Sequence, residues 1–291
     1  MRRALTRRIH PMTILDSHVH FWNPGRLTYR WLDKVPSLKR TWEPEHFAEA
    51  SKGLGVEGIL FVECGRDPAE NVAEAVWVGE LAAREPRIRG IVAHASVERG
   101  RAVSEELAAL REHPLVRGVR RLIQDEPDPR FCVRPEFIEG VRAVGEHGYT
   151  FDLCVFHHQL MAVKELVRRC PEVTFVLDHV GKPAIREGRL DPWRTDLLDL
   201  ASLPNVWCKL SGMVTEADHA NWRPEELRPY IDRVLNCFGY ARTMFGGDWP
   251  VSTLASSYAR WVEVVREAVS AASEEDRSRL FSGNAKRCYR L

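Results

Sequence analysis

Two histidines at alternate positions near the start of the chain are the first residues whose types and spacing could support chemistry. His18 and His20 lie in the segment DSHVH, which ends an apolar run that begins near Ile14. Side chains alternate along a β-strand, so both imidazoles project from one face and could bind a single divalent metal ion. A pair of ordinary hydrogen-bonded histidines is the alternative. A position at the end of the first strand of a barrel would favour the ligand pair.

A second group of polar residues follows an apolar run that begins near Val173. The sequence FVLDHVGKP places Asp178 and His179 directly after apolar residues, which a strand tolerates where its end faces a solvent-filled site. His179 is therefore a candidate metal ligand or proton carrier. A structural pair formed by Asp178 and His179 is the alternative interpretation.

Asp248 is the third candidate. The sequence MFGGDWP places its carboxylate straight after two glycines, at the end of another apolar run. A carboxylate there can bind the metal, accept a proton from an attacking water, or do both in turn. If these runs are strands of one barrel, Asp248 faces the same opening as the histidines.

Other polar and aromatic residues near predicted strand ends are candidates for binding the substrate. Cations there suit an anionic or polyhydroxylated ligand and could stabilise the negative charge that grows on a carbonyl oxygen. For Lys209, a lysine that snorkels from a strand end is the alternative. The cations are Arg120, Lys182 and Lys209; Glu63, Asp152, Ser211 and Trp249 are further candidates, and Trp22, Tyr29 and Trp31 could form an apolar wall against a sugar ring. We interpret His94 as structural.

The elements that must position these residues alternate between strands and helices. Short apolar runs, each followed by a stretch of helical periodicity, recur about every 30 residues, as successive βα units do. We predict strands that begin near Ile14, Val56, Ile88, Val116, Thr150, Val173, Val206 and Thr243. The fold class is therefore α/β, a (β/α)8 TIM barrel in a single domain of residues 13–291, with a C-terminal helix closing the chain. An open doubly wound sheet is the alternative, but the first strand lacks the G-x-G-x-x-G turn.

Two long connections interrupt this pattern. The stretch 21–45 contains Pro24, Gly25 and Pro36 and is too long for a tight turn, so we interpret it as an active-site loop. A second irregular stretch is predicted for 214–229. These loops would determine which substrate is accepted.

Composition restricts the partners. The chain has 42 Lys+Arg against 41 Asp+Glu, a net charge of +1, which is too small for a broad field that attracts nucleic acid or an anionic membrane. We expect a small-molecule partner. The sequence does not indicate the oligomeric state. Seven cysteines, without a C-x-x-C pair, favour a reducing, cytoplasmic location. Residues 1–12 are interpreted as a basic N-terminal tail, with a short transit peptide as the alternative.

Taken together, the segments DSHVH, GVRRL, LDHVGKP, FGGDWP and LFSGNAKRCYRL resemble the amidohydrolase superfamily, in its amidohydrolase-2 branch that includes sugar lactonases. The resemblance extends from Ile14 to Leu291. It implies that His18 and His20 are first-strand metal ligands, that His179 is the sixth-strand histidine, and that Asp248 is the general base. It also implies one divalent ion, zinc or manganese, although the branches include metal-free sites.

Two departures from the resemblance bear on the metal. Many metal-binding relatives carry a fifth-strand histidine, whereas this strand reads FDLCVF and is followed by His157 and His158. Arg120 stands on the fourth strand, where other branches have a residue that bridges two metals. Arginine stays protonated and has no lone pair to donate, so we expect at most one metal ion.

The activity that the resemblance implies is hydrolysis of a sugar-acid lactone, of the L-fucono- or L-rhamnono-lactone type, by attack of an activated water on the ring carbonyl. A related branch implies an alternative, the non-oxidative decarboxylation of an aromatic or muconate-type acid. A third interpretation is a barrel that binds a carbohydrate without chemistry.

Overall fold

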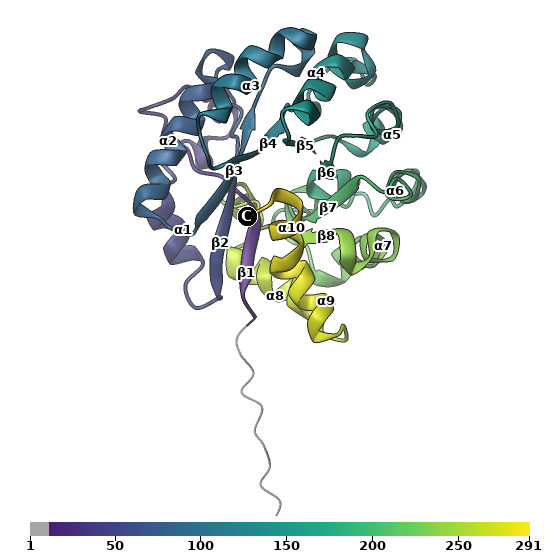
Figure 1. The fold of residues 1–291 in the computed structure, drawn as a ribbon. Coiled ribbons are helices and arrows are strands. Elements are labelled where there is room, and N and C mark those ends of the chain that lie inside the picture. Colours follow the sequence, from purple (N-terminus) through teal and green to yellow (C-terminus); the bar gives the residue numbers. More distant parts are fainter. Residues whose placement is uncertain (1–11) are drawn as a thin grey trace, which may run out of the picture.

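The fold is a barrel of parallel strands, shown in Figure 1. The computed structural model describes residues 12–291, so the basic tail predicted for residues 1–12 lies outside the described residues except for Met12. The strands begin where the sequence predicts them, the sixth two residues later. They are β1 (Ile14–Val19), β2 (Val56–Val62), β3 (Ile88–His94), β4 (Val116–Arg120), β5 (Thr150–Leu153), β6 (Phe175–Leu177), β7 (Val206–Leu210) and β8 (Thr243–Phe245).

The eight strands form one sheet in the order of the sequence, and every pair is parallel. The first and last strands meet through their ends: the Asp248 amide donates to the His18 carbonyl and the His20 amide to the Trp249 carbonyl, each at 2.7 Å. The predicted single-domain TIM barrel is confirmed. The backbone of the candidate site residues itself closes the barrel.

Helices cover the outside of the barrel. In α4, for example, Phe137, Ile138, Val141 and Val144 recur at helical spacing and are buried against the strands. The helices are α1 (Pro44–Ala50), α2 (Asn71–Arg84), α3 (Ser104–Arg111), α4 (Pro135–Glu146), α5 (Leu160–Arg169), α6 (Trp193–Ala201), α7 (Pro224–Arg242), α8 (Tyr258–Ala268), α9 (Glu274–Ser278) and α10 (Asn284–Tyr289). Between residues 12 and 291, none of the helices has the length and apolar character needed to cross a membrane.

The two long connections differ in how well the sequence predicts them. The first contains only short 3-10 turns at Arg30–Lys34 and Pro36–Leu38 before α1 begins. The second was predicted to stay irregular through residue 229, which is wrong, because α7 begins at Pro224 and continues through Pro229. A proline at the first helical position is compatible with a helix, and the buried side chains of Tyr230, Ile231 and Val234 hold the following turns against the barrel.

The interior of the barrel has its own apolar cluster. Its members come from several strands and from the C-terminal helix: Leu15, Leu60, Val62, Val92, Val176, Met244, Ala285, Cys288 and Tyr289. In Figure 1, α10 crosses the ring of strands and the C-terminus lies near the middle of the ring. The chain ends in a helix, as predicted, and the structure adds that this helix closes one end of the barrel and leaves the other end for a site.

Candidate active site

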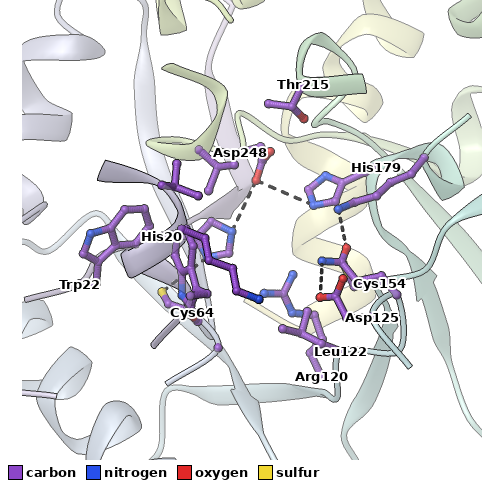
Figure 2. Close-up of a pocket in the computed structure, with 17 residues that line it drawn as sticks. His20, Trp22, Cys64, Arg120, Leu122, Asp125, Cys154, His179, Thr215 and Asp248 are labelled. Atoms are coloured by element: carbon purple, nitrogen blue, oxygen red, sulfur yellow. Dashed lines mark hydrogen bonds and ion pairs between the residues drawn. The ribbon is translucent and has the colours of Figure 1, made fainter. Parts of the chain in front are cut away.

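A cavity of about 420 Å³ opens at the carboxyl ends of the strands, the end at which TIM barrels carry their sites. Figure 2 shows Asp248 at its wall between His20 and His179, with Arg120 across the cavity. Residues from most of the strand ends and the loops after them line it: His20, Trp22, Trp31, Lys34, Val35, Cys64, Gly65, Arg120, Leu122, Gln124, Asp125, Cys154, His179, Lys182, Thr215, Asp248 and Val251.

Three histidines converge on one oxygen of Asp248. The distance from Oδ1 is 3.5 Å to His20 Nε2 and 3.8 Å to the Nε2 atoms of both His18 and His179. The Nε2 atoms of His18 and His20 are 3.2 Å apart. All four residues are at least 95% buried, so the structure brings together the four residues that the sequence singled out.

The opposite nitrogen of each imidazole is held by a partner. His20 Nδ1 donates to the Val62 carbonyl at 2.7 Å. His18 Nδ1 lies 3.3 Å from an Asp178 oxygen, and His179 Nδ1 lies 2.9 Å from the Ser211 hydroxyl. Such partners fix the ring orientation and the tautomer. In His18 and His20 they leave the lone pair on Nε2, facing the other ring and Asp248.

Burial and the neighbouring charges set the protonation of this cluster. Burial lowers the pKa of His179 to about 4, against the attraction of Asp248 and Asp178. Burial also lowers the pKa of His18 well below its usual range. For Asp248, burial opposes ionisation, but the neighbouring histidines outweigh it and hold the pKa well below the usual range. At neutral pH Asp248 is therefore a carboxylate, which can accept a proton or bind a cation, beside a neutral His179 imidazole.

The backbone at two of the strand ends adopts a conformation that L-residues seldom take. After β6, His179, Val180 and Lys182 have φ of 52°, 50° and 45°, and after β8 Asp248 has φ of 54°. The turn after β6 is held by Trp193, whose indole N–H donates to the Val180 carbonyl at 2.8 Å. A β-branched residue at positive φ is a genuine outlier, and such strain clusters at functional sites.

The donor set fits one divalent metal ion. His18, His20 and Asp248 offer ligand atoms within 4.8 Å of one another, and so do His18, Asp178 and His179. The ligand atoms of a tetrahedral zinc ion, each about 2.0 to 2.1 Å from the metal, lie about 3.3 Å from one another. The Nε2 atoms of His18 and His20 and Oδ1 of Asp248 lie 3.2 to 3.8 Å from one another, which matches that spacing. Nitrogen and carboxylate donors are those that zinc prefers.

Arg120 fills the place beside this cluster. Its guanidinium donates to Glu63 at 2.8 Å and to Asp178 at 3.1 Å, and Nη1 lies 3.4 Å from His18 Nε2. A fixed cation here repels a second metal ion. One part of Arg120 also reaches the cavity, so the same side chain supports the cluster and can contact a ligand.

Several predicted substrate residues lie beneath the cavity instead of lining it. Glu63, Asp152 and Lys209 have no exposed surface, and Lys209 forms ion pairs with Asp152 and Asp178 at 2.6 and 3.0 Å. Trp249 packs among Phe21, Trp42 and Phe47. Within residues 12–291, none of these four predicted residues lines the cavity. His94, interpreted as structural, is the last residue of β3 and is 8% exposed.

Other predicted residues do reach the cavity. Trp22 and Trp31 line it, in edge-to-face contact with ring centroids 5.2 Å apart. Tyr29 turns away, with its hydroxyl 3.3 Å from Glu74. Lys182 lines the cavity and donates to Gln124. Burial disfavours its charge, but the neighbouring Glu216 and Asp248 carboxylates raise the pKa of Lys182 and keep it a cation.

Sequence reasoning missed the residues that the loops supply. Lys34, Gln124, Asp125 and Thr215 line the cavity but lie outside strands, in segments without periodicity. Only the length of the loop 21–45 signalled that Lys34 belongs to the site. His157 and His158 follow β5 in a 3-10 turn, and His157 Nδ1 donates to the Lys182 carbonyl at 2.9 Å, so it supports the loop after β6.

The fold and the site define a TIM-barrel protein with a histidine and aspartate centre at its carboxyl end. The model of the amidohydrolase family matches residues 15–291, and the chain belongs to this family. An L-fucono-1,5-lactonase of Burkholderia multivorans is 38% identical over 95% of this chain and 96% of its own length. An L-fucono-1,5-lactonase of Burkholderia ambifaria is 30% identical over 95% of each. The solved structure of an amidohydrolase from Burkholderia multivorans with bound zinc is 34% identical, covers 96% of this chain and 99% of that one, and superposes with a TM-score of 0.85.

Proposed function

We propose that this protein hydrolyses the lactone of a sugar acid, of the L-fucono- or L-rhamnono-lactone type, by attack of an activated water on the ring carbonyl. The observation that carries the proposal is the Asp248 carboxylate at the wall of the cavity, with one oxygen 3.5 to 3.8 Å from nitrogens of three histidines. The similarity to two L-fucono-1,5-lactonases supports the choice of substrate class. Sugar-acid lactones are small enough for a cavity of about 420 Å³.

Asp248 is the proposed base and His179 its partner. The Asp248 carboxylate takes a proton from water, and the hydroxide forms a bond to the ring carbonyl carbon. The ring C–O bond then breaks, and the protonated Asp248 gives its proton to the leaving ring oxygen. The product is an open-chain hydroxy acid. His179, held by Ser211, faces the same carboxylate oxygen and orients it toward the water.

Arg120 and Lys182 are the proposed donors to the developing oxyanion. Both line the cavity and both are cations, and one well-placed donor is worth about 3 to 4 kcal/mol in such sites. Trp22 and Trp31 supply an apolar wall for the sugar ring. Glu63, Asp152, Lys209 and Trp249, predicted as substrate-binding residues, are proposed instead to position those that touch the substrate.

We also propose that His18, His20, His179 and Asp248 can hold one divalent ion, zinc or manganese. Three observations support this proposal: the grouping of donor atoms from His18, His20 and Asp248, the distance of 3.8 Å from His179 Nε2 to the same Asp248 oxygen, and the zinc bound in the Burkholderia multivorans amidohydrolase. A divalent ion in this place would supply Lewis-acid polarisation of a carbonyl oxygen. The cytoplasmic location stays a prediction; all seven cysteines, which lie within the described chain, are free.

A substrate panel tests the proposal. The purified protein is incubated with L-fucono-1,5-lactone, L-rhamnono-1,4-lactone and their stereoisomers, and acid release is followed with a pH indicator, with and without chelator or added zinc and manganese. Aromatic acids are assayed in parallel for released carbon dioxide. We expect acid release from one or more lactones. Carbon dioxide from an aromatic acid, without lactone turnover, would favour the decarboxylase alternative.

A further inference from the structure

The C-terminal helix carries a tyrosine whose side chain is buried inside the barrel. Tyr289, the last residue of α10, has no exposed surface. Its hydroxyl donates to Asp152 on β5 at 2.7 Å. In Figure 1 the helix and the C-terminus lie across the ring of strands. The end of the chain therefore reaches Asp152 inside the barrel from the side opposite the cavity.

A continuous set of charged contacts leads from this tyrosine to the candidate site. Lys209 donates to the same Asp152 oxygen at 2.6 Å and lies 3.0 Å from Asp178 Oδ1. Asp178 Oδ1 lies 3.3 Å from His18 Nδ1. All five side chains are fully buried, with relative exposure of 0%. Such contacts polarise one another in a low-dielectric interior, so removal of one alters the next.

The strands leave room for the C-terminal segment. Gly90 and Gly118 each occupy the third position of their strand, β3 and β4. A methyl group on Gly90 would lie 2.7 Å from Leu291, and one on Gly118 would lie 3.4 Å from the Tyr289 ring and 2.3 Å from Thr150. The barrel end is thus shaped around the last residues of the chain.

We infer that Tyr289 is a positioning residue for the reaction: through Asp152, Lys209 and Asp178 it sets the orientation of His18 beside Asp248. Loss of the Tyr289 hydroxyl leaves Asp152 with one donor fewer. Lys209, which serves both carboxylates, then moves toward Asp152 and away from Asp178. Asp178 Oδ1 then loses part of its contact with Lys209. Because the same oxygen faces His18 Nδ1, the His18 imidazole shifts as well.

Tyr289→Phe tests this inference, because it removes one oxygen and keeps the ring that seals the barrel. We expect kcat on the lactone to fall about tenfold, with KM within twofold of the wild type. Tenfold is the lower end of the range for residues that hold a metal ligand in place without touching the metal. The imidazole ¹⁵N resonances of His18, assigned by their loss in His18→Asn, are expected to shift in protein kept in chelator without substrate. A merely structural role would leave these resonances in place.

Two further variants keep the test decisive. Asp152→Asn keeps the shape of the side chain and removes its charge. We expect shifted His18 resonances, a nearly unchanged KM and a larger fall in kcat than in Tyr289→Phe. This variant still tests the inference if Tyr289→Phe folds poorly. Tyr230→Phe, which removes a buried hydroxyl that contacts the Ala184 carbonyl on the outer side of the barrel, is the control and should leave kcat and His18 unchanged. Unshifted His18 resonances in both Tyr289→Phe and Asp152→Asn, or an unchanged kcat, would overturn the inference.

The inference rests on the proposed function only for its kinetic readout. The His18 resonances are recorded without substrate, so a shift can be seen whether or not a lactone is turned over. A wild-type protein that opens no lactone would refute the proposed function alone. A wild-type protein that opens lactones, with unmoved His18 resonances in the variants, would refute the role of Tyr289 alone.

Discussion

Two lysines at strand ends of the same barrel have opposite surroundings. Lys182, after β6, lines the cavity and contacts Gln124. Lys209, on β7, is fully buried between Asp152 and Asp178. The same residue type thus lines a cavity in one case and belongs to a buried charge network in the other. The comparison shows that the site has two layers, one that can touch substrate and one that holds the first in place.

The largest expected effect lies in the upper layer, at Asp248. Asp248→Asn removes the base while keeping the shape, and asparagine tolerates the positive φ of 54° at this position. We expect kcat to fall by about 10³- to 10⁴-fold, with an unchanged circular dichroism spectrum. Asp125→Asn, at the wall of the same cavity, is the control and should keep most of the turnover. Full activity in Asp248→Asn would refute the assignment of the base.

In the lower layer the largest effect should be on stability. Lys209→Met leaves Asp152 and Asp178 without their shared cation, and breaking a buried pair costs about 3 to 5 kcal/mol. Urea unfolding measures the loss in free energy. Lys182→Met is the matched variant: its unfolding free energy should stay within about 1 kcal/mol of the wild type, while KM for the lactone rises. Equal destabilisation by the two substitutions would contradict the division into layers.

Metal binding tests whether the cluster of histidines and Asp248 in the upper layer holds one metal ion. We expect one zinc ion per chain, measured by elemental analysis after dialysis against a limited zinc concentration. His20→Asn should weaken zinc binding by more than about 100-fold, because loss of a residue that only supports a metal ligand already costs about 10- to 100-fold. His94→Asn, also on a strand end but without a place in the cluster, is the control. Two ions per chain would contradict the place given to Arg120.

The smallest effect concerns a histidine of the lower layer. Burial, with the positive charge of Arg66 next, lowers the pKa of His94 to about 3. The unfolded chain protonates this histidine below about pH 6.5 while the folded protein does not. The free energy of unfolding should therefore fall as the pH decreases below about 6.5, with a loss from this one proton of up to about 1.4 kcal/mol over the first pH unit. His94→Gln should make the free energy of unfolding less dependent on pH. An equal slope of this free energy against pH in the variant and the wild type, between pH 7 and 5, would contradict the lowered pKa of His94.

The sequence predicts the barrel well because alternation of strands and helices is local information. It also places His18, His20, His179 and Asp248 at strand ends, and a closed barrel brings such ends together whatever the loops do. Burial depth is not local information: the sequence near Lys209 does not reveal that Asp152 on β5 and Asp178 directly after β6 pair with it. For the same reason Trp249 was predicted at the substrate, although three aromatic neighbours bury it.

Loops and the C-terminus account for the rest. Lys34, Gln124 and Thr215 reach the cavity from segments without periodicity, so no pattern could single them out. Tyr289 lies in a helix predicted only as the end of the chain, 137 positions from its partner Asp152. The start of α7 was also predicted wrongly: Pro229 lies inside this helix, whose buried face holds it against the barrel.

In the proposed reaction, a water that Asp248 deprotonates attacks the ring carbonyl of a lactone. Hydrolysis of the preferred lactone in water enriched in ¹⁸O, followed by mass spectrometry of the product acid and its fragments, tests this most directly. We predict one ¹⁸O atom in the carboxylate and none in the hydroxyl that derives from the ring oxygen. Label in that hydroxyl, or an enzyme that releases no acid from any lactone, would contradict the account.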